Sequence, residues 1–374
     1  MDGNDDTPTL PNLFTHARSE LAQDAVIAYI LQWASPNYRM SNSEMNALGE
    51  HLLRSLLACS AQATGIAGLS EDEPITELAV DTQVRGIDIL VVVNLHIALV
   101  IEDKIDTHEH SRQIARYRQT VSQILANSPT PPIVHAVYLK TGNESPHRRP
   151  AADVCGIMMR EQLLAILHQH AQVNDQIVQQ FRQYLQAIET ETQSYRILPP
   201  TQWSARAIEG FYTAIVSWLM ELHRSGQVPV PTHPQWSYQA NRTDGERVCA
   251  WYWITLKPAQ LEGWLQLRDA STLNLRIAHC PVGETKPRVE PAQMYEVLGQ
   301  LQKLAAQSAW QGQIVVQKAG RFRGGDSAAV AELSFDTTGS GWLPLTSHGL
   351  LDWPEACRRL KLAMEFVEAV RSSC

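Results

Sequence analysis

The sequence lacks the features of a membrane, secreted or strongly basic protein. No apolar run approaches the roughly 18 residues of a membrane-spanning helix. The first residues, Met1–Asp6, have no basic region followed by an apolar stretch, so we expect no signal peptide. The six cysteines form no CxxC pair, which favours reduced thiols in a cytoplasmic protein. The net charge of −8 gives no general attraction for polyanions, but it does not exclude local basic patches.

What is present is typical of a globular protein. Hydrophobic residues make up 44% of the 374-residue chain and charged residues 19%, which is enough material for two domains. We predict a flexible tail over residues 1–14, a first domain over 15–195 and a second domain over 196–374. We expect the second domain to bind substrate or a partner. Residues 225–245, rich in Pro, Gly, Asn and Thr, indicate a boundary or long loop.

In the first half of the chain, hydrophobic periodicity changes from helical to strand-like and back. The pattern predicts helices over 18–33, 41–61 and 110–127, and strands over 75–80, 86–93, 97–105 and 133–139. The run Ile97–Ile101 is entirely apolar, which is typical of a strand buried on both faces. This order of elements predicts an α/β fold with a mixed central sheet flanked by helices.

The second half of the chain has a different hydrophobic pattern. After a helical segment over 160–191 and 201–224, the pattern predicts strands over 247–256, 263–279, 313–321 and 328–335, and helices over 291–308 and 354–372. This part reads as α+β. Nine of the ten tryptophans follow residue 200; at their spacings they are expected in the core, with platforms for stacked bases as the alternative.

Polar side chains interrupt two of the apolar strands of the first half. Asp88 opens one strand, and Glu102 and Lys104 close the next. Because side chains alternate along a strand, Glu102 and Lys104 share one face. Burying two carboxylates and an amine is costly unless a partner compensates them. Mg²⁺ prefers oxygen ligands, so these carboxylates and a backbone carbonyl suit it. The alternative is a structural ion pair between Glu102 and Lys104.

The register of the hairpin decides whether this site can form. Asp88 and Glu102 lie on the same face if a three-residue loop, Asn94–His96, joins the two strands. A two-residue loop would place them on opposite faces unless a bulge compensates.

This arrangement resembles the PD-(D/E)XK nuclease superfamily, although Ile87 stands where many members have proline. The resemblance covers about residues 15–141 and implies a restriction-endonuclease-like core. It implies that Asp88, Glu102 and the backbone carbonyl of Asp103 bind Mg²⁺, for which Mn²⁺ substitutes. It also implies that Lys104 assists the attacking water.

Two further elements support the resemblance. Gln113 and Tyr117 match the Gln-x-x-x-Tyr element that lies beside the active site of RecB-like members; ordinary helix packing is the alternative. Glu20 resembles the helical glutamate that many members place near the metal. A first-turn glutamate favoured by the helix dipole is the alternative for Glu20, and Asp24, one turn on, is a weaker candidate.

Basic residues suggest further contacts with nucleic acid. Arg112, Arg116 and Arg118 follow the Glu-X-Lys triplet and face either a phosphate backbone or solvent. Lys318, Arg321 and Arg323 precede two glycines, which indicates a hairpin tip able to probe a groove or a solvated turn. His108 and His110 have no neighbouring partners for a closed zinc site, so we interpret them as a polar helix entrance.

The leading hypothesis is therefore a Mg²⁺-dependent endonuclease. The resemblance favours DNA over RNA as substrate and, by association, a role in prokaryotic antiviral defence. Such a protein would act as a homo-oligomer or with a defence-system partner. The alternative is a non-catalytic nucleic-acid-binding or assembly subunit that kept the fold; the intact Asp88, Glu102 and Lys104 argue against it. A scaffold whose second half recruits a partner protein is the third hypothesis.

Overall fold

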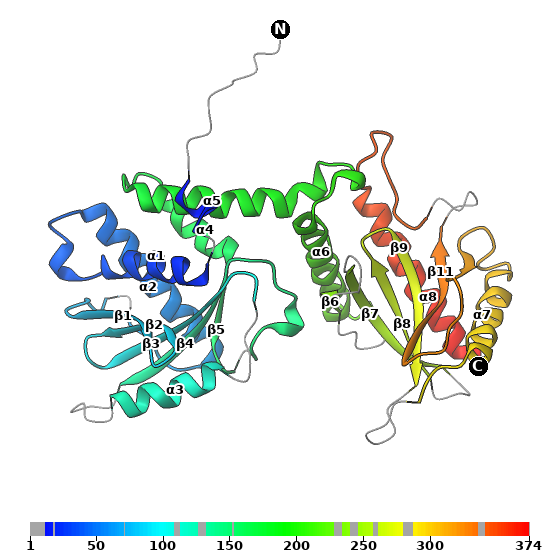
Figure 1. The fold of residues 1–374 in the computed structure, drawn as a ribbon, viewed down its shortest axis with the longest axis horizontal. Coiled ribbons are helices and arrows are strands. Elements are labelled where there is room, and N and C mark those ends of the chain that lie inside the picture. Colours follow the sequence, from blue (N-terminus) through cyan, green and yellow to red (C-terminus); the bar gives the residue numbers. More distant parts are fainter. Residues whose placement is uncertain are drawn as a thin grey trace, which may run out of the picture. The chain divides into compact units, whose positions relative to one another are not determined.

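The computed structural model divides the chain into two compact units (Figure 1). The N-terminal unit contains the described residues up to Glu144 and Arg148–Thr190. The C-terminal unit contains Ser145–His147 and the described residues from Glu191 onward. The structure describes residues 12–17, 19–70, 72–107, 113–125, 132–151, 153–227, 234–239, 246–256, 261–279, 287–335 and 341–373.

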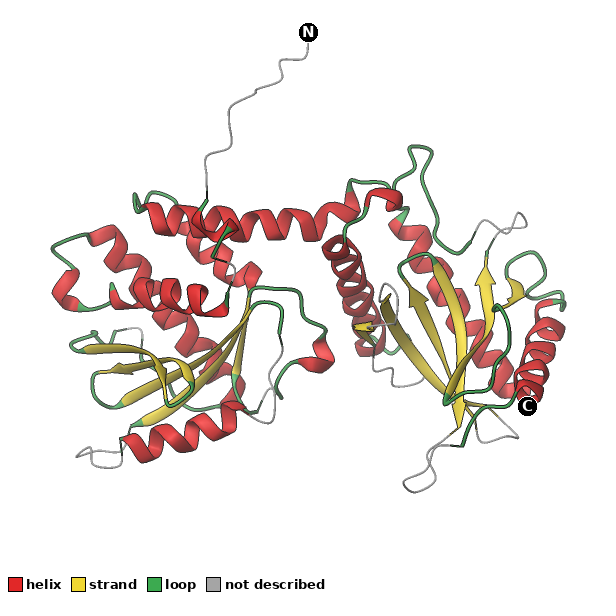
Figure 2. Cartoon of the chain, viewed as in Figure 1, coloured by secondary structure: helices red, strands yellow, loops and turns green. Residues whose placement is uncertain are grey.

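The N-terminal unit is an α/β fold with helices on both faces of a mixed sheet (Figure 2). Strands β1, β2 and β3 pair antiparallel, whereas β3–β4 and β4–β5 pair parallel, in the order β1-β2-β3-β4-β5. Its elements are α1 (Glu20–Gln32), α2 (Ser43–Thr64), β1 (Leu78–Val84), β2 (Ile87–Val93), β3 (Ile97–Lys104), α3 (Gln113–Ile124), β4 (Ile133–Lys140), β5 (Gly156–Met159), α4 (Arg160–Gln169) and α5 (Gln176–Gln193).

Alternation along β2 and β3 separates two cores. Ile89, Val91, Leu99 and Ile101 pack with α1 and α2 on one face of the sheet. The intervening residues pack with α3 on the other face. Every residue of β3 is buried, as expected for a central strand covered on both sides.

Local signals explain where the first helices begin and end. Ser19 caps α1 by accepting a hydrogen bond from the backbone N–H of Ala22. Asn42 caps α2 in the same way, by accepting a hydrogen bond from the backbone N–H of Met45. Gly65 ends α2 in the left-handed conformation that glycine adopts without a steric penalty.

The C-terminal unit is built on a six-stranded antiparallel sheet in the order β10-β11-β9-β8-β7-β6. Three helices and one side of the sheet form a single hydrophobic core. The elements are α6 (Ala205–Arg224), β6 (Gln235–Gln239), β7 (Glu246–Leu256), β8 (Leu261–Arg268), β9 (Thr272–His279), α7 (Pro291–Ala305), β10 (Val315–Lys318), β11 (Ser327–Ser334) and α8 (Trp353–Ser373).

The structure corrects the sequence interpretation at three places. The segment 225–245 contains β6, which pairs with β7. The single strand predicted over 263–279 is two strands, β8 and β9, joined by a turn in which Asp269 and Ala270 have positive φ. The short strand β5 was not predicted. Among the described residues, no helix has both the length and the apolar character to cross a membrane.

Candidate active site

The β2–β3 hairpin brings the predicted carboxylates together. Val93 pairs with Ile97, so the loop is Asn94–His96, and Ile89 pairs with Ile101. The same register places Asp88 opposite Glu102. Of the two loops considered, the structure has the three-residue one, and both carboxylates lie on one face of the sheet.

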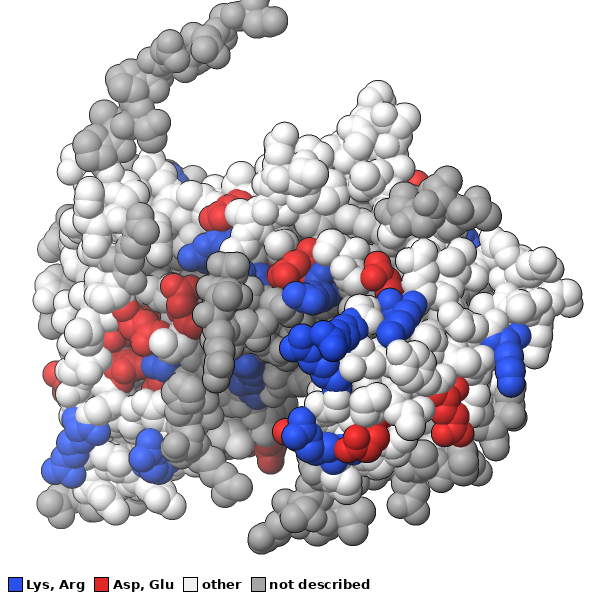
Figure 3. Space-filling model, turned by 45° about the vertical axis from the view of Figure 1, so that its right-hand side comes forward, with Lys and Arg blue, Asp and Glu red and all other residues white. Residues whose placement is uncertain are grey.

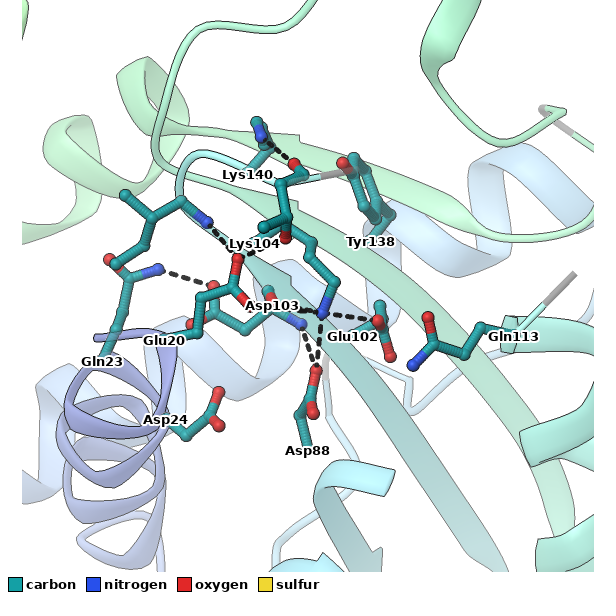
Figure 4. Close-up of polar contacts among 12 residues, drawn as sticks. Glu20, Gln23, Asp24, Asp88, Glu102, Asp103, Lys104, Gln113, Tyr138 and Lys140 are labelled. Atoms are coloured by element: carbon teal, nitrogen blue, oxygen red, sulfur yellow. Dashed lines mark hydrogen bonds and ion pairs between the residues drawn. The ribbon is translucent and has the colours of Figure 1, made fainter. Parts of the chain in front are cut away.

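The ammonium of Lys104 lies at the centre of the site (Figure 4). Its Nζ lies 2.6 Å from Glu102 Oε1, 3.3 Å from Asp88 Oδ2 and 2.9 Å from the backbone carbonyl oxygen of Asp103. The Asp103 backbone N–H donates to Asp88 Oδ2 over 3.1 Å, which fixes that carboxylate. Lys104 therefore ties together the three oxygen donors that the sequence pointed to.

Glu20 reaches the same site from the first turn of α1. Its Oε1 accepts hydrogen bonds from the Ile105 N–H (3.2 Å) and the Thr107 hydroxyl (2.5 Å). Its Oε2 lies 3.8 Å from Lys104 Nζ. The glutamate thus holds the segment that leaves β3 while presenting its second oxygen to the site.

The opposite face of β3 carries a second, buried polar cluster. Gln23 Nε2 donates to Asp103 Oδ1 (2.6 Å), and the Thr141 hydroxyl donates to Gln23 Oε1 (2.8 Å). Asp24 accepts from Gln83 Nε2 (3.0 Å). Gln23, Asp24 and Asp103 are all buried, so α1 contributes polar groups to both sides of the strand end.

Burial controls the charge of these carboxylates. Desolvation, aided by Asp88, raises the pKa of Glu102 to about 7 although Lys104 opposes the shift. Desolvation and the charge of Asp88 also raise the pKa of Asp24 to about 6. The pKa of Asp103 is raised well above its usual range by burial and by Asp24. The site is thus rich in carboxyl groups whose ionised form needs a compensating cation.

Lys104 responds in the opposite sense. Burial alone would lower the pKa of its ammonium, but Glu102, Asp88 and Glu20 more than offset this effect and raise the pKa above its ordinary value. In the absence of another cation, Lys104 is therefore protonated and acts as the counter-charge of the pocket.

The helix α3 lines the site with amide and phenol groups. Gln113 lies beside Glu102 (Figure 4), and its Nε2 donates to Tyr117 Oη over 2.7 Å. Arg116 is exposed, whereas Arg118 donates to the carbonyls of Val134 and Val154. Arg118 is thus neither a free phosphate ligand nor part of a solvated face. Arg112, His108 and His110 lie outside the described residues.

A second lysine beside the site was not predicted. Lys140 pairs with Lys104 in the parallel β3–β4 register, and it is fully buried. Its Nζ donates to the carbonyl oxygen of Thr107 over 2.5 Å and lies 3.6 Å from Glu144, which accepts from the Tyr138 hydroxyl. The sequence signal that could have identified Lys140 is a charged residue at the end of an apolar strand, as at Lys104.

The basic cluster predicted at 318–323 lies in the C-terminal unit. Lys318 ends β10, and its ammonium lies 4.7 Å from the ring centre of Tyr295 and 4.5 Å from that of Phe322. It also donates a hydrogen bond to Tyr295 Oη over 2.8 Å. Arg321 and Arg323 are exposed in the connection to β11. On the face drawn in Figure 3, basic side chains gather in a patch with acidic side chains at its edge.

The donor set of the active site fits a hard divalent cation. Asp88, Glu102 and the Asp103 carbonyl are oxygen donors around one positive charge. No donor within the described part of the chain hydrogen-bonds to the buried Glu102 Oε2. The described residues contain no group of three His, Cys, Asp or Glu side chains placed to hold a metal, so the fit rests on two carboxylates and the carbonyl.

Comparison with known proteins identifies the N-terminal part of the chain. A family model described as the PD-(D/E)XK nuclease superfamily matches residues 11–225. Neither a curated protein nor a solved structure matches the chain. The matched segment includes Glu20, Asp88, Glu102 and Lys104, and it is more than half of the chain.

Proposed function

The chain belongs to the PD-(D/E)XK nuclease superfamily, and from this we propose that it hydrolyses phosphodiester bonds of nucleic acid with the help of Mg²⁺ or Mn²⁺. The observation that carries the proposal is the convergence of Asp88, Glu102 and the Asp103 carbonyl on the Lys104 ammonium. An isolated structural ion pair would need only one of these oxygens.

The residues of the site would have different roles in in-line hydrolysis. Asp88, Glu102 and the Asp103 carbonyl would hold the cation, with Glu20 as a further carboxylate at the edge of the site. When bound, the cation polarises the phosphate and lowers the pKa of a water molecule. Lys104 lies beside these ligands, where its ammonium orients that water and offsets negative charge on the phosphorane-like transition state.

The charge state of Lys104 fits this role. Its pKa is raised by the neighbouring carboxylates against the effect of burial. The side chain is therefore an ammonium, which can donate a hydrogen bond to the attacking water and offset negative charge on the transition state.

The finer features of the activity follow from the family. Because superfamily members act mostly on DNA, we propose DNA as the substrate and internal cleavage as the reaction. The association of such nucleases with prokaryotic defence extends the proposal to an antiviral role. Gln113 lies beside Glu102 (Figure 4) and donates a hydrogen bond to Tyr117, and these two side chains would support substrate positioning.

The test is cleavage of plasmid, linear duplex, single-stranded DNA and RNA, each with Mg²⁺, Mn²⁺, Ca²⁺ or chelator. We expect Asp88→Ala and Glu102→Ala to abolish cutting, and Lys104→Ala to lose about 10²–10⁴-fold in rate. Ca²⁺ should support binding with little cleavage.

Glu20→Gln should lower the rate without unfolding the protein. Glu44→Gln is its matched control, since Glu44 is the first-turn glutamate of α2. Equal rates for these two variants would reduce Glu20 to a helix-start residue. A wild-type protein that cuts none of the substrates and binds no ion by calorimetry would favour the non-catalytic binding subunit.

A further inference from the structure

The sheet of the C-terminal unit has a second face that its hydrophobic core does not use. The core contains residues of α6, α7 and α8 together with one side of the strands, and α8 runs across that side (Figure 2). The residues that alternate with the core positions belong to neither the core nor its partly buried rim. We call this surface the second face; on β8 and β9 it carries Glu262, Trp264, Gln266, Arg268, Thr272, Asn274 and Arg276.

Most tryptophans of this unit are core residues, but two are not. Trp236, Trp251 and Trp342 are buried in the core, and four more pack against it. Trp253 and Trp264 are half-buried and belong to neither group. These two rings are therefore not explained by the packing of the unit.

A strained backbone places Trp253 on the second face. Cys249 and Trp251 point into the core, so strict alternation would send Trp253 there too. Instead a bulge between Trp251 and Ile254 shifts the register against β8, and Tyr252 has a φ of +60°. Tyr252 then turns into the core, where its hydroxyl donates to Glu368, and Trp253 emerges on the opposite side. Bulges and positive φ at non-glycine residues often mark functional sites.

Trp264 lies next to this bulge in the sheet. Its strand neighbours, Gly263 and Leu265, pair with Ile254 and Trp251, so Trp264 faces the bulged segment that contains Trp253. Across the next strand it pairs with Arg276, whose guanidinium lies 5.9 Å from the Trp264 ring centre. The arginine also donates to the Ser327 hydroxyl over 2.9 Å. Two aromatic rings and a guanidinium thus form one row across the sheet.

The next row of the second face carries amides. Gln266 and Asn274 pair across β8 and β9, and both are buried although no core requires them. Each offers a donor and an acceptor on one side chain. Along a strand, this row is about 7 Å from the aromatic row.

Aromatic rings, a guanidinium and amides side by side on one sheet face are the chemistry that recognises unpaired bases. Rings stack on the faces of bases, and amides pair with base edges. Glu262 and Glu332 also lie on this surface, at β8 and β11. It is therefore not the uniformly basic groove that follows the phosphates of a duplex.

We propose that the second face binds unpaired bases of a single-stranded nucleic acid, with Trp253 and Trp264 as stacking platforms. The inference rests on the proposed nuclease function, because it names the form of nucleic acid that this chain takes. Arg276 supports the Trp264 ring, and Gln266 and Asn274 contact the edges of the stacked bases.

The test is equilibrium binding by fluorescence anisotropy, using the full chain with Asp88→Ala in chelator so that nothing is cut. The probes are fluorescein-labelled dT20, U20 and a 20-base-pair duplex. We expect both single strands, dT20 and U20, to bind more tightly than the duplex. Loss of stacking by Trp264→Leu should weaken single-strand binding by roughly 5- to 150-fold.

Trp264→Phe is the matched variant, because it keeps an aromatic face while changing the size of the side chain. It should bind within a few-fold of the parent, and Trp253→Leu should weaken binding as Trp264→Leu does. Circular dichroism and thermal unfolding check that each variant is folded. Leu and Phe variants that bind equally well, or a duplex that binds as tightly as dT20, would overturn the proposal.

These outcomes are separable from failure of the proposed function. Cleavage is measured on the wild type with Mg²⁺, whereas binding is measured on a protein that cannot cut. A chain that cuts normally but binds single strands independently of Trp264 disproves only the inference. A chain that never cuts but binds them through Trp264 disproves only the nuclease.

Discussion

At the residue scale, Glu102 and Lys104 control each other's proton. Lys104 Nζ lies 2.6 Å from the fully buried Glu102 carboxylate. Burial nevertheless raises the pKa of Glu102 to about 7, so near neutral pH a proton and a metal ion compete for the same oxygen atoms. Metal binding should then release protons.

The first prediction is a pH-dependent affinity for Mg²⁺. Glu102 is protonated below its raised pKa and ionised above it, so affinity should be steady above about pH 7.5. Below pH 7 the Mg²⁺ affinity should decrease as the pH falls, approaching about tenfold per pH unit, because one proton must leave before the ion binds. Isothermal titration calorimetry at pH 6, 7 and 8, in two buffers of different ionisation enthalpy, measures both the affinity and the released proton.

Glu102→Gln provides the comparison for this measurement. It keeps the size of the side chain but has no proton to lose, and it should bind Mg²⁺ weakly at every pH. A wild-type affinity that is the same at pH 6 and pH 8 would remove Glu102 as the titrating ligand.

At the element scale, the first helical turns of α1 serve both faces of β3. Glu20 bonds the segment that follows the strand, whereas Gln23 and Asp24 lie on the side of the Asp103 carboxyl group. Two buried carboxyls, Asp24 and Asp103, face each other there with raised pKa values. Such a pair costs stability whenever it ionises.

The second prediction is that Asp24→Asn stabilises the metal-free protein at alkaline pH. The folded pKa of Asp24, about 6, lies above its unfolded value, so the folded state binds more protons between about pH 4 and 6. Stability therefore falls as pH rises through this window. The variant should gain on the order of 3 kcal/mol at pH 8 and almost nothing at pH 4.

Urea unfolding in chelator, followed by far-UV circular dichroism, measures this gain. Asp81→Asn is the control, because Asp81 is an exposed carboxylate on β1 and surface substitutions change stability by less than about 0.5 kcal/mol. A gain in stability at pH 8 no larger than that of the control would show that the folded state does not disfavour the ionised form of Asp24.

Strand alternation explains what could be predicted at this scale. It placed Glu102 and Lys104 on one face, and it showed that a three-residue loop, which the hairpin has, brings Asp88 to that face without a bulge. It could not show what Asp103 meets on the other face, because Gln23 is 80 residues away in the chain. The β8–β9 turn escaped prediction because Asp269 and Ala270 adopt positive φ without the glycine that usually signals such a turn.

At the scale of the whole chain, the two units differ in how much their sequence revealed. The N-terminal unit contains a polar triplet in apolar strands, which predicted its fold and pointed to its site. The C-terminal unit has no comparable motif: β6 was not predicted, β8 and β9 were predicted as one strand, and no strand pairing was predicted. There, Trp253 differs from Trp251 only through the bulge at Tyr252, a tertiary feature that periodicity does not encode.

The third prediction concerns the basic cluster of the C-terminal unit. Replacing Lys318, Arg321 and Arg323 with glutamine should weaken nucleic-acid binding. It should also reduce the slope of log affinity against log salt by about one unit per lost phosphate contact. Because Lys318 is already engaged by Tyr295 and Phe322, we expect the two arginines to account for most of the change.

Arg358→Gln is the control, since Arg358 is exposed but ion-paired with Glu355. Anisotropy between 50 and 300 mM salt gives the slopes. If the triple variant and the control share the wild-type slope, the cluster is a solvated turn.

Because the Lys104 ammonium already neutralises the carboxylates of the active site, a metal ion can enter only by replacing it as their counter-charge. A sodium or potassium ion entering the site would replace one positive charge by another and gain little Coulomb energy. A divalent ion brings twice the charge to the same oxygens and can displace the ammonium. Selection against monovalent ions therefore needs no cavity of special size. The choice among divalent ions is left to their geometry and bound water.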